Sequence, residues 1–241
     1  MNTLMALAAA AGGYLIGSLS FARIITALLS PRTGVPEKTA LEIEGSDKKL
    51  IFTSISATSV SANVGAGGGF LTFQLDMLKI FIPVMLLKHH FPGQHVHLIA
   101  AAAGVTGHIW PVYHRFKGGR GISSIYGGIL AIDWLGIPVA ALGSLLVGLV
   151  ILRNLYFTYM AGLWLLIPWL WFRTHDPYVI LHLVFVNVLF TIATLPEMRQ
   201  YFRLKKEAHW SDPFQAWQVS AMGRGITRMA RRLSLIKRDR K

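Results

Sequence analysis

Long apolar runs constrain the fold of this sequence more than any other feature. A helix that crosses a bilayer needs about 20 mostly apolar residues. Seven stretches approach or exceed that length: 4–29, 70–87, 97–113, 122–135, 137–151, 155–172 and 178–195. Only 15% of the 241 residues are charged and the mean hydropathy is +0.48, whereas a soluble domain carries roughly 25% charge. We therefore expect an all-α polytopic membrane protein with about seven transmembrane helices.

The distribution of cations predicts how these spans are oriented. Excess Lys and Arg marks the cytoplasmic side of a membrane protein. If the N-terminus lies outside, the outer loops keep only Lys88 and Arg173, accompanied by Asp133 and Asp176. The inner loops and the tail then hold the other loop cations. The first run lacks the basic start of a cleaved signal peptide, so we expect a retained span. The sequence thus predicts a multi-pass protein of the cell membrane, with its N-terminus outside and its C-terminus cytoplasmic.

Two regions are not expected to span the membrane. Residues 1–195 would form the transmembrane domain, which includes a polar cytoplasmic loop over residues 30–69. Residues 196–241 carry twelve Lys and Arg against four Asp and Glu. Apolar residues recur at helical spacing near the end of this tail, which predicts a basic amphipathic helix lying on anionic lipid headgroups. A solvated helix or one bound to a protein partner is the alternative. Nucleic-acid binding is not expected of an integral membrane protein with such a tail.

The stretch "GHIWPVYHRFKGGRG", residues 107–121, brings glycines and cations together between two predicted spans. Glycine lets a ligand approach the main chain closely, and consecutive amides can converge on an anion. Lysine and arginine add charge-assisted donors. It is not a nucleotide P-loop, because G-x-x-x-x-G-K-[ST] is absent. The stretch predicts a phosphate-binding loop, and a flexible turn that obeys the positive-inside bias is the alternative. The loop residues concerned are Lys117, Gly118, Gly119, Arg120 and Gly121.

Ionisable residues inside predicted spans are further candidates. Asp76 and Lys79 stand three residues apart, so they share a helix face and can neutralise each other where an unpaired charge is costly. They form either a structural ion pair or, through Lys79, a contact to phosphate. His108, near the end of the third span, is either a packing residue or a catalytic one. The chain has no cysteine, which excludes disulfides and thiolate metal sites. We expect no cofactor and no metal.

Three stretches together resemble a known family. "GSLSFARII", "SISATSVSANVGAGGGFLTFQLDMLK" and "GHIWPVYHRFKGGRG" are similar to motifs of the bacterial acyl-phosphate:glycerol-3-phosphate acyltransferase family, PlsY. The resemblance covers roughly residues 13–198. It implies a seven-span enzyme of phospholipid biosynthesis with its site facing the cytoplasm. Such an enzyme transfers a fatty acyl group from acyl phosphate to the 1-hydroxyl of glycerol 3-phosphate, which gives lysophosphatidic acid. Positioning and charge neutralisation can supply most of the catalysis, because acyl phosphate is already activated.

The resemblance also assigns roles along the chain. It implies that the catalytic residues are Ser54, Thr58, Ser59 and His108, and that Lys79 binds substrate phosphate together with the loop residues 117–121. Two family asparagines are serines here (Ser54 and Ser59), a family arginine is Ala62, and the family's R-H-R-E-N falls on "TLPEM", where only Glu197 matches. We therefore expect a rebuilt second phosphate subsite. Its candidate residues are Gly45, Ser46, Lys48, Lys49 and Arg23.

These departures leave two classes of function open. The chain is either an active acyltransferase of a divergent type, or a catalytically silent membrane scaffold or partner subunit derived from that family. An acyl carrier protein or coenzyme A thioester is an alternative acyl donor. A small-solute transporter is disfavoured, because such proteins are built from internal repeats around a site near mid-bilayer, and this sequence has no convincing repeat.

Overall fold

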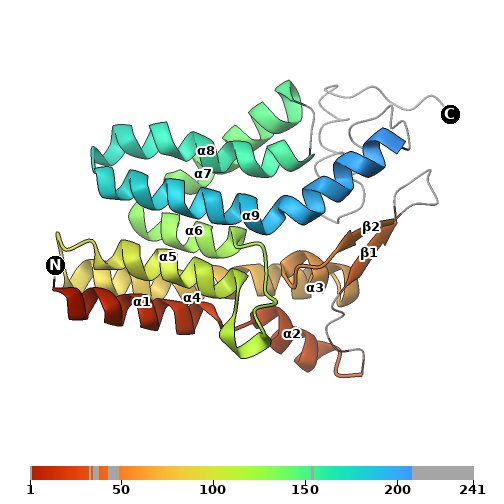
Figure 1. Ribbon diagram of the computed structural model, residues 1–241, viewed down its shortest axis with the longest axis horizontal. Helices are drawn as coiled ribbons and strands as arrows, with labels where there is room; N and C mark the ends of the chain where they lie inside the picture. The colour runs from red at the N-terminus through yellow and green to blue at the C-terminus, as the bar shows by residue number, and fades with distance from the viewer. Residues whose placement is uncertain (1, 33, 35–37, 43–48, 153–154, 208–241) are drawn as a thin grey trace.

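The computed structural model describes residues 2–32, 34, 38–42, 49–152 and 155–207. In Figure 1, α1, α4 and α5 lie along one side of the molecule, α7, α8 and α9 lie along the other, and α6 lies between them. The elements in chain order are α1 (Thr3–Gly17), α2 (Phe21–Leu29), β1 (Thr39–Glu42), β2 (Lys49–Phe52), α3 (Ala57–Asn63), α4 (Ala66–His90), α5 (Val96–Ile109), η1 (Val112–His114), α6 (Ile122–Ile132), α7 (Gly136–Gly143), η2 (Ser144–Ile151), α8 (Leu155–Thr174) and α9 (Pro177–Glu207).

The helices confirm the mainly helical prediction, whereas the span count stays a prediction. Among the described residues, three helical stretches are long and apolar enough to cross a membrane: Thr3–Leu29, Ala66–His90 and Pro177–Leu204. The segments Ile122–Ile132 and Gly136–Gly148 are apolar but shorter. The orientation also stays a prediction. The expected boundary at 195/196 falls inside α9, and the predicted amphipathic helix of the tail lies outside the described residues.

The first predicted span is interrupted. α1 ends at Gly17 and α2 begins at Phe21, so residues 18–20 leave the helical path. The Ser18 hydroxyl donates to the Tyr14 carbonyl at 2.8 Å, a local bond by which serine competes with regular helix geometry. The break leaves the Leu19 carbonyl outside the helical ladder, where it accepts a hydrogen bond from Lys79 Nζ at 2.6 Å. The stretch is still long and apolar enough to cross a membrane, but it consists of two helices, and the interruption has a structural use.

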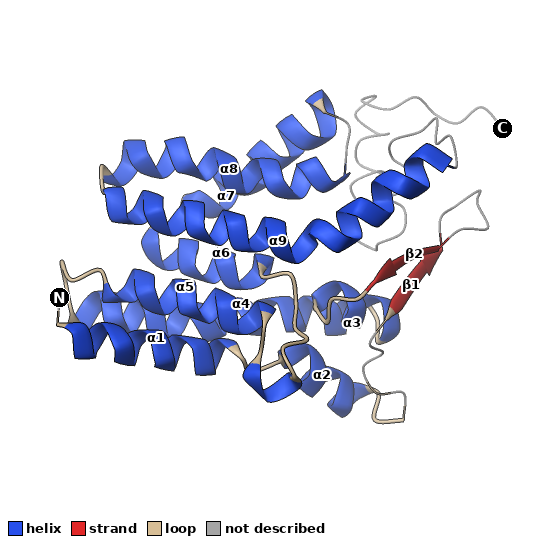
Figure 2. Cartoon of the chain, viewed as in Figure 1, coloured by secondary structure: helices blue, strands red, loops and turns tan. Residues whose placement is uncertain are grey.

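The described part of the polar region 30–69 contains regular elements where we expect a loop. β1 and β2 form an antiparallel pair in which Thr39 lies opposite Phe52 and Glu42 opposite Lys49, so the fold is not purely α-helical. Figure 2 shows this hairpin beside the C-terminal part of α9. The Ile51 amide of β2 donates to Gln200 Oε1 of α9 at 3.3 Å. The Ser- and Gly-rich end of the region forms α3 and the first turn of α4 rather than a loop. Gly69 allows this, because a Cβ there would collide with Ala57 and Ser61 of α3.

Close contact between α1 and α5 fixes the end of α5. A Cβ on Gly13 or Gly17 would collide with the backbone of Ala100 or Gly104, respectively. Helices in membranes commonly approach through small residues spaced four apart, because lipid provides little hydrophobic drive for helix association. Gly107, near the end of α5, similarly lies against the Tyr14 carbonyl. The two helices therefore meet backbone to backbone just before His108.

The residues predicted for the outer loops lie together at the opposite end of the bundle. Lys88 Nζ donates to the carbonyls of Ala131 and Ile132 at 2.8 and 3.1 Å, where a cation satisfies the last turn of α6. Arg173 pairs with Asp133 at 3.4 Å. Both cations expected at this end therefore have internal partners.

Candidate active site

The glycine- and cation-rich loop folds back onto the end of α5. The Gly119 amide donates to the His108 carbonyl at 3.1 Å, and the Lys117 amide donates to the His114 carbonyl at 3.0 Å. The Gly118 carbonyl accepts from the Ile55 amide at 2.9 Å, which joins the loop to the segment before α3. The loop is thus a packed element, and at least two of its amides are engaged by the protein itself.

Close packing explains the glycines of this loop. A Cβ on Gly118 would collide with the His108 carbonyl, and one on Gly119 would collide with the His108 ring at Nε2. Gly121 has φ +97°, a left-handed conformation that side chains rarely adopt, and it immediately precedes α6. We had expected consecutive amides converging on an anion. For Lys117 and Gly119 that expectation is wrong, because their amides donate to backbone carbonyls.

Arg120 links three segments that are distant in the sequence. Its guanidinium donates to Thr58 Oγ1 at 2.7 Å and lies 3.5 Å from the Glu197 carboxylate on α9. It also lies over the Phe52 ring, with 5.5 Å from its central carbon to the ring centroid, within cation–π range. Only 9% of the residue is exposed. The structure thus brings together two residues predicted for the site, Thr58 and Arg120, and adds Phe52, which no motif had indicated.

The two serines of the site differ in their surroundings. The Ser59 hydroxyl donates to the Ser56 carbonyl at 2.7 Å and accepts from the Ser56 amide at 2.9 Å, so it organises the start of α3. The Ser54 hydroxyl is buried and has no hydrogen-bond partner within the part of the chain that the structure describes. An unsatisfied buried hydroxyl is costly. Ser54 therefore offers a donor, whereas the hydroxyl of Ser59 is engaged locally.

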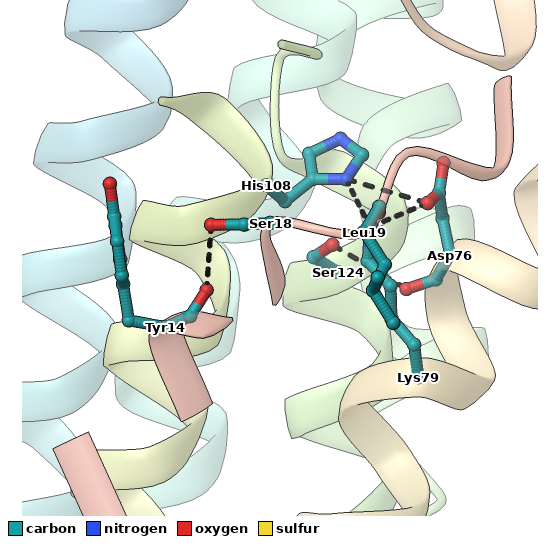
Figure 3. A network of polar contacts seen from close by, with 7 residues as sticks. All are labelled: Tyr14, Ser18, Leu19, Asp76, Lys79, His108 and Ser124. Atoms are coloured by element: carbon teal, nitrogen blue, oxygen red, sulfur yellow. Dashed lines mark hydrogen bonds and ion pairs between the residues drawn. The ribbon is translucent and has the colours of Figure 1, made fainter. Parts of the chain in front are cut away.

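A second polar cluster lies beside the loop, inside the bundle. Figure 3 shows Asp76, Lys79, His108 and the Leu19 carbonyl converging on one point. Lys79 Nζ lies 2.7 Å from Asp76 Oδ1 and 3.0 Å from His108 Nδ1, in addition to its bond to Leu19. Ser124 of α6 donates to the Asp76 carbonyl at 3.4 Å. The ion pair expected at spacing three is confirmed, and it includes His108.

This cluster changes the expected role of Lys79. An ammonium group has three donors, and the three contacts of Lys79 Nζ account for all of them. The residue is 7% exposed. Lys79 therefore has no donor left for a phosphate in this arrangement, and the structural ion-pair interpretation is the one that the geometry favours.

The remaining candidates are spread around the loop. Arg23 on α2 donates to the Lys117 carbonyl at 3.3 Å, which places a second cation at the loop. The Lys117 side chain and Lys49, at the start of β2, are exposed. His114 is half-buried near these cations. Burial first, and then the positive charges of Arg23 and Lys79, hold the pKa of His114 below its ordinary value. Gly45, Ser46 and Lys48 lie outside the described residues.

The side chains at the loop are donors rather than metal ligands. Among the described residues, no group of three or more His, Asp or Glu side chains is arranged to hold a metal ion. The donors gathered at the loop are a guanidinium and hydroxyls, which match phosphate oxygens in charge and geometry. The site is thus suited to an anionic ligand at one end of the bundle.

Fold and site together define a polytopic helical membrane protein with a candidate anion site at one end of the bundle. The comparison with known families is more specific. The family model described as glycerol-3-phosphate acyltransferase matches residues 44–203, and the chain belongs to this family.

Individual relatives agree with this assignment. A glycerol-3-phosphate acyltransferase of Janthinobacterium sp. (strain Marseille) is 35% identical over 142 residues, which cover 57% of this chain and 63% of the relative. One from Cupriavidus necator is 34% identical over 166 residues, which cover 67% and 72%. The chain thus spans slightly under two thirds of the length of the first of these relatives.

Solved structures of PlsY (YgiH), an integral membrane glycerol 3-phosphate acyltransferase, have a similar fold. The lysophosphatidic acid form has 25% sequence identity and a TM-score of 0.67, and the match covers 82% of this chain and 92% of that one. The glycerol 3-phosphate form has 23% identity, a TM-score of 0.68 and the same coverage. This chain therefore has the fold of an integral membrane protein, although it contains the substitutions noted above.

Proposed function

We propose that this chain transfers a fatty acyl group from acyl phosphate to the 1-hydroxyl of glycerol 3-phosphate at the cytoplasmic face of the cell membrane. The hydroxyl oxygen attacks the acyl carbon, the bond from that carbon to the phosphate oxygen breaks, and the hydroxyl proton leaves with the phosphate. Lysophosphatidic acid and inorganic phosphate are the products. Family membership supports the reaction class, and acyl phosphate as the donor rests on the resemblance of the motifs.

The observation that carries the proposal is the placement of Arg120. Its guanidinium is held by Thr58 and Glu197 at fixed distances of 2.7 and 3.5 Å, on a loop whose backbone is pinned to His108. A pre-positioned cation stabilises the negative charge on the phosphate as it leaves the acyl carbon, without reorganisation. In this account Thr58 orients Arg120, and Ser54 supplies a hydroxyl donor to the substrate.

The second phosphate subsite is rebuilt around different cations. Position 62 is alanine and positions 195 and 198 are leucine and methionine, none of which can donate a hydrogen bond to phosphate from its side chain. Among the described residues, Arg23 is our candidate to replace the missing donors, because it donates from α2 to the Lys117 carbonyl of the loop. We assign the second phosphate to Arg23 and to the exposed Lys117.

The activity is tested with purified protein in lipid, acyl phosphate and labelled glycerol 3-phosphate. Expected are equal amounts of lysophosphatidic acid and released phosphate, both strongly reduced in Arg120→Ala. Acyl coenzyme A and acylated acyl carrier protein replace acyl phosphate in parallel reactions. Faster turnover with either one would refute acyl phosphate as the donor. No transfer from any donor, beside an active PlsY control, would refute the enzyme.

If the assay detects no acyl transfer, the alternative function is a catalytically silent membrane scaffold. It is tested in cells that depend on the protein. If the protein is an enzyme, the Lys117→Ala, Arg120→Ala double variant should fail to support the growth of these cells. A scaffold would instead tolerate that variant and fail when residues 211–241 are removed, because the basic tail would then carry the contact to anionic lipid or to a protein partner.

Orientation has a direct test because the chain has no cysteine. Lys117→Cys places one thiol at the candidate site, and His89→Cys places one at the opposite end, where α4 ends. A membrane-impermeant maleimide applied to intact cells should label only the His89 variant. Labelling of only the Lys117 variant would place the site on the outer face and refute the proposed orientation.

A further inference from the structure

His108 has two ring nitrogens in different surroundings. Figure 3 shows the dashed contacts reaching one of them, while the other points away from Asp76 and Lys79. Nδ1 lies 3.0 Å from Lys79 Nζ, and the same ammonium donates to the Leu19 carbonyl and to Asp76. Each of the three Lys79 donors thus has one acceptor, and Nδ1 of His108 is the third.

This contact fixes the tautomer of His108. An ammonium cannot accept a hydrogen bond, so Nδ1 must contribute its lone pair and the ring proton must sit on Nε2. The carboxylate at 2.7 Å from Nζ favours the ammonium over a neutral Lys79.

The proton on Nε2 faces the glycine-rich loop. Gly119 lies so close that a Cβ would collide with Nε2, and its amide donates to the carbonyl of His108. Nε2 makes no hydrogen bond to any residue that the structure describes. Glycine at position 119 therefore leaves an N–H donor at the loop without a protein acceptor in front of it.

We infer that Lys79 is a positioning residue that holds His108 as the Nε2–H tautomer, and that this N–H donates to a phosphate oxygen of a substrate bound at the loop. The identity of the ligand rests on the proposed function, whereas the tautomer does not. The Lys79 ammonium, which we expect from the sequence to contact phosphate, thus acts indirectly, through the imidazole ring of His108. Arg120, in the loop, and His108, near the end of α5, then contribute one donor each.

Asp76 cannot replace Lys79 in this role. Its Oδ1 lies 3.6 Å from His108 Nδ1 and is an acceptor. If the ammonium were removed, a carboxylate would be the nearest partner of Nδ1 and would favour the proton there. Nε2 would then present a lone pair to the phosphate oxygen, which is repulsive. Lys79→Met is therefore expected to exchange the two tautomers, in addition to its effect on stability.

Nitrogen NMR of histidine-labelled protein in micelles tests the tautomer without any activity. The protein has nine histidines, and the signal that disappears in His108→Gln identifies His108. A proton on Nε2 alone is expected in the parent protein, and a proton on Nδ1 alone in Lys79→Met. A parent protein with the proton on Nδ1, or with both nitrogens protonated, would overturn the inference. Lys88→Met, which removes another α4 ammonium that donates to carbonyls, should leave the signal unchanged.

Kinetics of two His108 variants test the donor itself and do not require Lys79 variants to fold. The amide of glutamine can replace Nε2–H, whereas that of asparagine lies near the position of Nδ1. His108→Asn should raise the KM of at least one phosphate-bearing substrate about 10- to 100-fold, as expected for losing a hydrogen bond to a charged group, and His108→Gln should recover most of it. Equal effects of both variants, or unchanged KM values, would overturn the donor role.

Titration separates failure of this inference from failure of the proposed function. Glycerol 3-phosphate and inorganic phosphate are each added to the labelled protein, and the Nε2 signal of His108 is followed. A saturable shift with either anion supports the donor even if no acyl transfer occurs. No shift with either, in a preparation that does transfer acyl groups, would overturn the donor and leave the enzyme proposal intact.

Discussion

Lys79 and Arg120 are two buried cations at the same end of the bundle, and the structure uses them differently. Lys79 sits in a long helix and donates to a carbonyl, a carboxylate and an imidazole, all of which belong to the protein. Arg120 sits in a loop and is held by a hydroxyl, a more distant carboxylate and an aromatic face. The first is a closed unit, whereas the second is a positioned cation at the candidate site.

The difference follows from where each cation obtains its partners. Asp76 lies one helical turn from Lys79, so the charge is balanced within one element, as an apolar environment requires. The partners of Arg120 come from α3 and α9, about 60 residues before it and 77 residues after it. Its geometry therefore depends on the assembled fold. A buried charge whose counterion lies on the same helix indicates architecture, and one whose counterion comes from a distant segment indicates a site.

Asp76→Asn gives the largest expected effect, on folding. It leaves the Lys79 ammonium in the bundle without its carboxylate, and breaking a buried pair in this way destabilises a protein by about 3–5 kcal/mol. The midpoint of thermal unfolding in detergent should fall accordingly. Asp133→Asn is the matched control, because its partner Arg173 is 42% exposed at the side chain, and about 1 kcal/mol is expected. Equal losses of stability in the two variants would show that the buried Asp76–Lys79 pair contributes no more than the half-exposed Asp133–Arg173 pair.

Arg120→Glu is expected to act on activity rather than on folding. Loss of a pre-positioned donor to developing charge reduces turnover about 100- to 1000-fold, and the new carboxylate also repels phosphate and Glu197. The acyl transfer assay measures kcat/KM. Arg203→Glu on the exposed part of α9 makes the same change in net charge and should retain activity. If Arg120→Glu unfolded the protein like Asp76→Asn while Arg120→Lys retained full activity, Arg120 would belong with Lys79 as architecture.

Periodicity and local spacing predicted much of the fold and one of these two clusters. Apolar runs located the helices, because burial in lipid demands them, and the spacing of Asp76 and Lys79 predicted their pairing. The break at residues 18–20 and the hairpin were missed. The break depends on a local hydrogen bond of Ser18 and the hairpin on pairing between two short strands. An average hydropathy reveals neither.

The Arg120 cluster was predicted only in part. Thr58 and Arg120 were both predicted for the active site, but in different phosphate subsites, and their direct contact was not predicted. Phe52 carried no signal, because its role comes from the way β2 presents it to the loop. The glycines of the loop were expected to face a ligand. Gly118 and Gly119 lie against His108. A sequence does not distinguish a glycine required by close packing from one required by a ligand.

Gly17→Ala sharpens the comparison by disturbing the frame of the Lys79 cluster. The new methyl group would collide with the backbone of Gly104, and overpacking of this kind costs about 1–3 kcal/mol. Gly12→Ala in the same helix has open space around it and should be neutral or stabilising by up to about 1 kcal/mol. Thermal unfolding distinguishes the two. If Gly17→Ala were as harmless as Gly12→Ala, the close approach of α1 to Gly104 would not be what fixes the end of α5 before His108.

His114 gives the smallest expected effect and reports on the cations themselves. Its pKa is lowered by burial and then by Arg23 and Lys79, so the folded state binds a proton less readily than the unfolded chain. Stability should therefore fall as the pH drops below about 6.5, and His114→Gln should flatten that slope.

Arg23→Gln should raise the pKa of His114, which NMR titration can follow, whereas Arg203→Gln should not change it. The comparison between the two buried cations predicts the direction of this result. Arg23 lowers the pKa of His114 more than Lys79 does, and Lys79 has Asp76 as its counterion at 2.7 Å, so removing Arg23 should give the larger change. If Arg23→Gln left the pKa of His114 unchanged, the field at the loop would come from Lys79, and the ion pair would not be the closed unit that its distances indicate.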